Sequence, residues 1–145
     1  MLIPQAPLIV AGAFAGVPDP ERAAGAIARG LRAGGCDHAE LCPLARADDA
    51  GEVRELLDAA GFDARMRSAR AVIIGCDRLA LRTLTGSFAF EVATRARQGG
   101  VPAYAVVGES ALGEFEARML DLQAILEADG ARGLAAAGRR LAALM

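Results

Sequence analysis

The stretch ARAVIIGCD, residues 69–77, does most to decide the fold class of this chain. Its central run is apolar, rich in β-branched residues and followed at once by glycine and by charge. An apolar run without polar alternation is typical of a strand that is buried on both faces, as in the middle of a parallel sheet. The runs from Ala6 to Ala11 and from Val101 to Val107 have the same character. We therefore expect a parallel sheet built around these three runs.

Helical patterns separate the apolar runs. Asp19 and Pro20 form an N-cap followed by proline at the first helical position, and Gly34 with Gly35 ends that helix. Further helices are expected after Asp48 and Asp49 as far as residue 60, and over 86–98, 112–120 and 134–144. Further strands are expected over 39–44, 62–66 and 122–126.

Strands that alternate with helices in this way indicate a parallel sheet with helices on both faces. The sequence predicts one Rossmann-like, three-layer α/β/α domain over residues 1–145, with a mostly parallel central sheet of about five or six strands. No repeat or long linker divides the chain.

The charge balance limits the partners. The formal net charge is −2, which gives no electrostatic case for nucleic acid or an anionic membrane. All 16 basic residues are arginine, because the chain has no lysine. Any phosphate here would be held by arginine, by backbone N–H groups or by a metal.

The sulfur and imidazole groups argue against a transition-metal site. The three cysteines, Cys36, Cys42 and Cys76, lack CxxC spacing, and His38 is the only histidine. We expect free thiols, no metal site and a cytoplasmic protein, since no secretory signal is evident at the N-terminus.

Several short motifs occur in a known order. The runs GCDRLA (residues 75–80) and TLTGS (83–87) are followed by a Gly-Val-Pro strand that ends at Gly108. Nearer the N-terminus, GAFAGV (12–17) follows the first strand and PLARADD (43–49) follows the second. This order resembles that of the type I glycerate kinase family over residues 8–60 and 70–145. The resemblance implies a Rossmann-like fold, with ATP and Mg²⁺ as cofactors only if kinase activity is retained. The second domain that the family inserts between these halves is absent.

The departures from the family bear on catalysis. The acidic and lysine residues that the resemblance leads one to expect are replaced at six positions, which are Gly12, Ala15, Arg46, Cys76, Ala80 and Ser87. Phosphoryl transfer depends on metal ligands and cations that neutralise developing charge. No catalytic residue is therefore assigned, and the chain is expected to be a degenerate, glycerate-kinase-like domain, a pseudoenzyme.

Ligands of open parallel sheets bind beyond the carboxyl ends of the strands. Three loops there supply the candidate ligand-binding residues, which are Gly12, Gly16, Asp77, Arg78, Thr83, Gly86, Ser87, Gly108, Glu109 and Ser110. Each has a plainer interpretation: a strain-relieving glycine turn for the first loop, a surface Asp–Arg pair with a helix cap for the second, and a helix cap for the third.

Three functions stay open on this evidence. The first is a small-ligand-binding or assembly module, with a small anionic metabolite as the expected ligand. The second is an active phosphotransferase that moves phosphate from ATP to a small hydroxy acid, alone or with a partner chain that supplies the missing lobe. The third is a homodimeric interaction protein. A dinucleotide oxidoreductase is disfavoured because no GxGxxG follows the first strand.

Overall fold

A computed structural model describes residues 6–12, 14, 16–44, 50–79, 88–112 and 114–145. In this part of the chain one sheet contains β1 (Leu8–Ala11), β2 (Glu40–Pro43), β3 (Val72–Leu79), β4 (Ala103–Ser110) and β5 (Leu122–Glu127). The strand order is β2-β1-β3-β4-β5, and every neighbouring pair is parallel. The predicted mostly parallel sheet of about five or six strands is confirmed, with five strands in the described residues.

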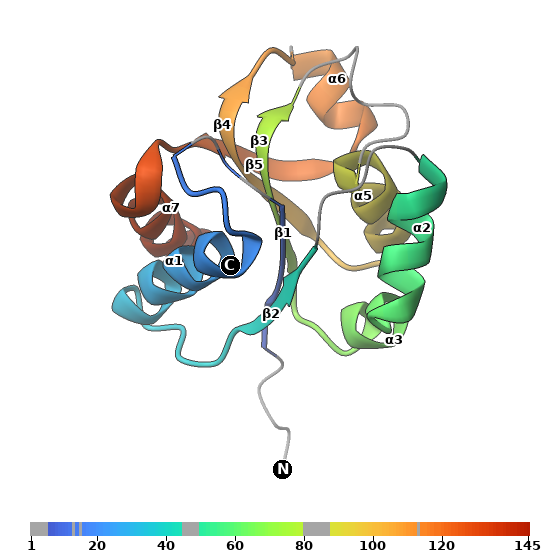
Figure 1. The fold of residues 1–145 in the computed structure, drawn as a ribbon, viewed down its shortest axis with the longest axis horizontal. Helices are drawn as coiled ribbons and strands as arrows, with labels where there is room; N and C mark the ends of the chain where they lie inside the picture. Colours follow the sequence, from blue (N-terminus) through green and yellow to red (C-terminus); the bar gives the residue numbers. More distant parts are fainter. Residues whose placement is uncertain (1–5, 13, 15, 45–49, 80–87, 113) are drawn as a thin grey trace.

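Helices cover both faces of the sheet. Helices α1 (Pro20–Ala33) and α7 (Gly130–Leu144) lie together on one face. On the other face lie α2 (Ala50–Ala59), α3 (Phe62–Arg67) and α5 (Phe88–Gln98). Helix α6 (Glu114–Met119) lies near the carboxyl ends of β3 and β4 (Figure 1). The chain moves outward from β1 to β2 through α1, then returns to β3 on the other side of β1. The order therefore reverses between β1 and β3, where open sheets bind ligands.

Alternate residues of the central strands build two cores. Leu8, Val72 and Ile74 pack toward α2, α3 and α5, whereas Ile9 and Ile73 pack toward α1 and α7. All five side chains are buried. This division explains the continuous apolar runs of the sequence, because strands covered on both faces have no solvent side.

Two glycines let α1 and α7 approach each other closely. A Cβ atom added at Gly30 would overlap the carbonyl oxygen of Ala135, and one added at Gly138 would overlap the carbonyl oxygen of Ile27. The backbones of the two helices are therefore in direct contact.

The strand expected over residues 62–66 is wrong, because this segment is helix α3. Phe62 and Met66 are buried on the same side, four residues apart, while Ala64 between them is exposed. Three apolar residues at every second position fit a strand, but the first and third also fit one face of a helical turn. Gly61, with φ 67°, supplies the left-handed residue before this helix.

Other expected elements are present with shifted ends. Helix α6 begins at Glu114, two residues later than expected, and α7 begins at Gly130, four residues earlier. Asp48 and Asp49, expected to open a helix, lie outside the described residues. None of the described helices is long and apolar enough to cross a membrane.

Candidate functional site

Strands β3 and β4 extend beyond the ends of their neighbours. Strand β1 ends at Ala11, which is paired with Gly75, but β3 continues to Leu79. The sequence predicts loops for both extensions, Cys76 to Arg78 and Gly108 to Ser110, and this prediction is wrong. The two segments pair with each other, Cys76 with Val107 and Arg78 with Glu109. Polar residues remain in strand conformation here because each extension satisfies the backbone hydrogen bonds of the other.

A cavity of about 320 Å³ lies beyond these carboxyl ends. Its lining comes from the loop after β1, from both extensions and from the segment between β5 and α7. The lining residues are Phe14, Gly16, Asp77, Arg78, Gly108, Glu109, Ala128, Asp129 and Gly130. The cavity therefore occupies the carboxyl edge next to the reversal in strand order, and its size suits a small metabolite.

The cavity brings together five of the residues named from the sequence: Gly16, Asp77, Arg78, Gly108 and Glu109. Two others do not line it. Gly12 is buried, and its N–H donates to the Gly75 carbonyl over 2.9 Å. The Ser110 hydroxyl instead accepts a hydrogen bond from the Leu112 N–H over 3.4 Å. The remaining candidates, Thr83, Gly86 and Ser87, lie outside the described residues.

Sequence reasoning missed four lining residues, which are Phe14, Ala128, Asp129 and Gly130. A signal existed, since Asp followed by Gly after a strand is typical of a helix start at the carboxyl edge. Asp129 is the N-cap of α7, yet its side chain makes no capping hydrogen bond. Its carboxylate is therefore not used by the helix that it precedes.

Two close backbone contacts shape the cavity. A Cβ added at Gly108 would lie 2.6 Å from the carbonyl oxygen of Asp77 and 2.8 Å from its Oδ1. A Cβ at Gly16 would lie 3.3 Å from the Cα of Gly130. Glycine at 108 thus leaves room for the Asp77 carboxylate, and glycine at 16 lets the loop after β1 reach the start of α7.

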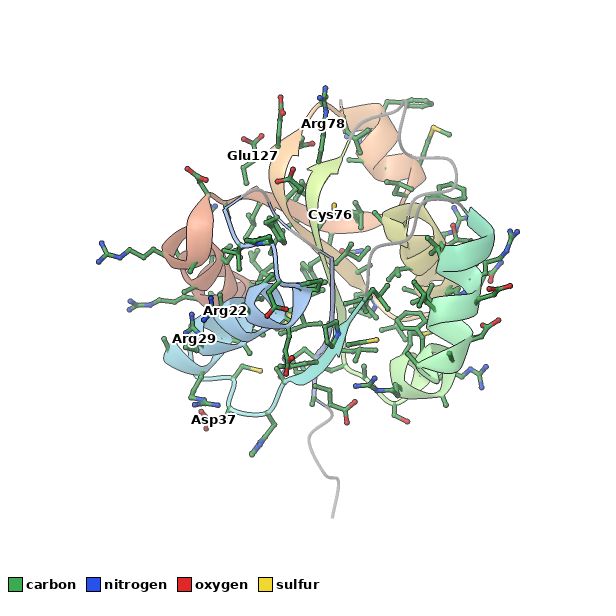
Figure 2. All side chains as sticks on the ribbon, viewed as in Figure 1. Arg22, Arg29, Asp37, Cys76, Arg78 and Glu127 are labelled. Atoms are coloured by element: carbon green, nitrogen blue, oxygen red, sulfur yellow. The ribbon has the colours of Figure 1, made fainter. Side chains whose placement is uncertain are left out.

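Acidic groups dominate the charge of this cavity. The lining residues include three acidic residues, Asp77, Glu109 and Asp129, and one arginine, Arg78. Both Asp77 and Arg78 are exposed, and Figure 2 shows Arg78 on the far end of β3. The cavity can therefore pair one anionic group with Arg78 while its carboxylates accept hydrogen bonds from hydroxyl or amino groups.

Cys76, next to this cavity on β3, is a neutral thiol. Its side chain is 6% exposed, and burial, together with the negative charge of Asp77, raises its pKa to about 12. A thiol with so high a pKa is a poor nucleophile and a poor ligand at neutral pH. Cys76 is therefore a small buried side chain of the core.

The other sulfur and imidazole groups are apart from the site. Within the described ranges the cysteines form no disulfide, and His38 lies exposed in the loop before β2. No group of three His, Cys, Asp or Glu side chains among the described residues can hold a metal ion.

Comparisons with known proteins bear on the family. The sequence profile of the glycerate kinase family matches residues 21–142, and no curated protein sequence matches the chain. Among solved structures, a protein assigned as glycerate kinase 2 from Salmonella typhimurium LT2 is similar, with 19% sequence identity and a TM-score of 0.49. The similarity covers 75% of this chain and 27% of that protein. Because the family profile covers well over half of its length, this chain belongs to the glycerate kinase family.

Proposed function

We propose that this domain binds a small hydroxy acid in the cavity at the carboxyl ends of the strands and no longer transfers a phosphoryl group. The observation that carries the proposal is the lining of that cavity, which includes one arginine and three acidic residues. The family's name supplies glycerate as the first ligand to test.

The lining matches the groups of such a ligand. Arg78 is suited to the single carboxylate of a hydroxy acid, because a guanidinium pairs with it through parallel N–H donors. Asp77, Glu109 and Asp129 are suited to its hydroxyl groups, since ionised carboxylates only accept hydrogen bonds. The same carboxylates repel a ligand with several negative charges. The anionic metabolite expected from the sequence is thus narrowed to one with a single carboxylate and several hydroxyls.

The replaced positions support the loss of catalysis. Gly12 presents only backbone, and Cys76 presents an un-ionised thiol, where the family resemblance implies charged side chains. Neither group neutralises the charge that develops on a transferred phosphoryl group. The other replaced positions, Ala15, Arg46, Ala80 and Ser87, lie outside the described residues.

Calorimetric titration with D-glycerate tests the binding. We expect Arg78→Ala to weaken binding about tenfold or more, because a hydrogen bond to a charged group contributes roughly 1.5–3 kcal/mol. Arg140→Ala, which removes an exposed arginine of α7 far along the helix from the cavity, is the matched control. Equal glycerate affinity in wild type and Arg78→Ala would overturn the binding site.

A coupled assay with ATP, Mg²⁺ and D-glycerate tests the loss of catalysis. The expected result is no phosphorylated product above the rate without protein. Turnover that Asp77→Ala abolishes would instead establish the alternative, an active phosphotransferase that uses replacement ligands. Because binding and turnover are measured separately, one half of the proposal can fail without the other.

A homodimer is a second proposal, supported by the surface of α6. Phe115 and Met119, four residues apart on that helix, are 73% and 60% exposed. Large apolar side chains exposed as neighbours are typical of surfaces that bind another protein. Light scattering after size exclusion should give twice the chain mass for the wild type and the chain mass for Phe115→Glu. A wild-type monomer at every concentration would refute it.

A further inference from the structure

A second cavity, of about 760 Å³, runs along helix α1. Gly16, in the loop after β1, borders both this cavity and the one at the carboxyl ends of the strands. Its lining combines apolar groups from that loop, β2 and α7 (Val17, Pro18, Leu41 and Ala131) with polar groups of α1. Neither the fold nor the proposed function accounts for this cavity.

Gly25 forms the middle of the α1 side of this cavity. A Cβ added there would meet no atom within 4 Å, so packing does not require glycine at this position. In this respect Gly25 differs from Gly30, five residues later on the same helix, which α7 forces to be glycine. Glycine within a helix is unfavourable relative to alanine. Its effect at position 25 is to leave open space beside the helix.

Two arginines flank that space. Arg22 and Arg29 lie three residues before and four residues after Gly25, which places all three on one face of α1. Both arginines are exposed, both border the cavity, and Figure 2 shows both on this helix. Their separation of seven positions corresponds to roughly 10 Å along the helix axis, within reach of two long side chains that turn toward each other.

The acidic lining residues are confined to the start of the helix. Asp19 is the N-cap, and its Oδ1 accepts the Glu21 N–H over 3.0 Å. Glu21 lies in the first turn. Between Arg22 and Arg29 the described cavity lining therefore presents guanidinium, glycine and apolar groups, but no carboxylate.

We propose that this cavity binds a small dianion with a compact carbon skeleton, clasped between Arg22 and Arg29 above Gly25. A phosphate monoester and a short dicarboxylate share this chemistry. Two guanidiniums neutralise the two charges, and their planar donors match either oxygen arrangement. The apolar wall of Leu41 and Val17 accommodates the carbon skeleton. This site is independent of the hydroxy-acid site at the strand ends.

Titration followed by amide NMR tests the site, with inorganic phosphate in one arm and succinate in the other. We expect saturable shifts at α1 residues, weakened about fivefold or more in Arg22→Gln and in Arg29→Gln, because each removes one charge-assisted pair. Arg140→Gln is the control for general loss of positive charge. Saturation by only one probe identifies the source of the dianion, and saturation by neither overturns the proposal.

Substitution of Gly25 provides a test that does not depend on charge. Gly25→Leu should fill the open space and abolish binding of both probes while the thermal midpoint stays equal or rises, because leucine favours helix. Gly25→Ala should keep binding, since its Cβ meets open space. Wild-type affinity in Gly25→Leu would overturn the proposal. Arg78→Ala should bind phosphate or succinate as tightly as the wild type does. That result would separate this site from the cavity at the carboxyl ends of β3 and β4.

Discussion

Close contacts between single atoms determine the shape of the cavity at the carboxyl ends of β3 and β4. The Asp77 carboxylate occupies the place where a side chain at position 108 would begin. Close contacts of this kind cannot be inferred from composition, because they depend on how two neighbouring strands sit side by side. They also make substitutions at the contact informative.

Gly108→Ala should destabilise the protein and weaken D-glycerate binding together. The new Cβ would lie 2.6 Å from the Asp77 carbonyl oxygen, so the strand extensions must shift. We expect a loss of about 1–3 kcal/mol in the free energy of unfolding, measured with urea. Gly25→Ala is the matched control, and it should stabilise by about 0.5–1 kcal/mol because its Cβ meets open space. A Gly108→Ala protein with unchanged stability would contradict the contact.

The Cys76 thiol should make stability fall in alkaline solution. Its pKa is raised from 9.0 in the unfolded chain to about 12 in the folded protein, so the folded state keeps a proton that the unfolded state loses. The stabilisation is complete below pH 9 and falls by about 1.4 kcal/mol per unit as the pH rises toward 12. Cys76→Ala should remove this part of the slope in urea unfolding series, whereas Cys36→Ala, at a half-exposed position, should leave it. Equal slopes in wild type and Cys76→Ala would show that the thiol does not contribute.

At the scale of elements, one arginine joins three helices on the face opposite α1. Arg95 of α5 donates from Nη1 to Asp58 of α2 over 2.9 Å and to Asp63 of α3 over 3.1 Å. Its Nε donates to Glu91, one turn earlier, over 3.1 Å. The side chain is only 12% exposed, and these partners raise its pKa despite the opposing effect of burial.

Arg95→Ala should lower the free energy of unfolding by about 1–2 kcal/mol. The estimate is modest because Asp58 and Asp63 are 69% and 48% exposed, which leaves water to screen them once the guanidinium is gone. Arg54→Ala, an exposed arginine on α2, should change stability by less than about 0.5 kcal/mol. If high salt lowered the stability of the wild type no more than that of Arg95→Ala, the ion pairs of Arg95 would not account for its stabilising effect.

Elements were predicted correctly where a periodic pattern extends over enough neighbouring residues. They were predicted wrongly where the pattern is too short, and where pairing with a distant strand decides the conformation. The apolar run at 71–74 and the capped helix after Asp19 contain enough residues to show their type. Phe62 to Met66 is too short to distinguish a period of two from a helical turn. The extensions of β3 and β4 are polar, and only their mutual pairing keeps them in the sheet.

At the scale of the whole molecule, ligand binding should appear as added stability. A ligand that binds only the folded protein stabilises it by about 2.7 kcal/mol at a hundred times its dissociation constant. For a domain of this size we expect D-glycerate at that level to raise the thermal midpoint by roughly 5–10 °C in the wild type. Arg78→Ala at the same ligand concentration should show a much smaller rise. A midpoint that is insensitive to glycerate in the wild type would argue against the hydroxy-acid site.

Part of this architecture follows from the order of residues alone. Periodic apolar runs, N-cap residues and glycine stops identify the strands and most helices, because these signals act within a few neighbouring residues. They also placed Asp77, Arg78, Gly108 and Glu109 at the carboxyl edge of one sheet. The family's replaced residues, such as Cys76, are likewise visible in the chain itself.

Folding in three dimensions decided the rest. Gly30 is required while Gly25 is free, because α7, more than a hundred residues later, packs against one and not the other. Phe14 and Asp129 border the same cavity only because β1 and β5 end at one edge of the sheet. Contacts between such distant segments depend on the path of the whole backbone, so no local pattern of residues encodes them.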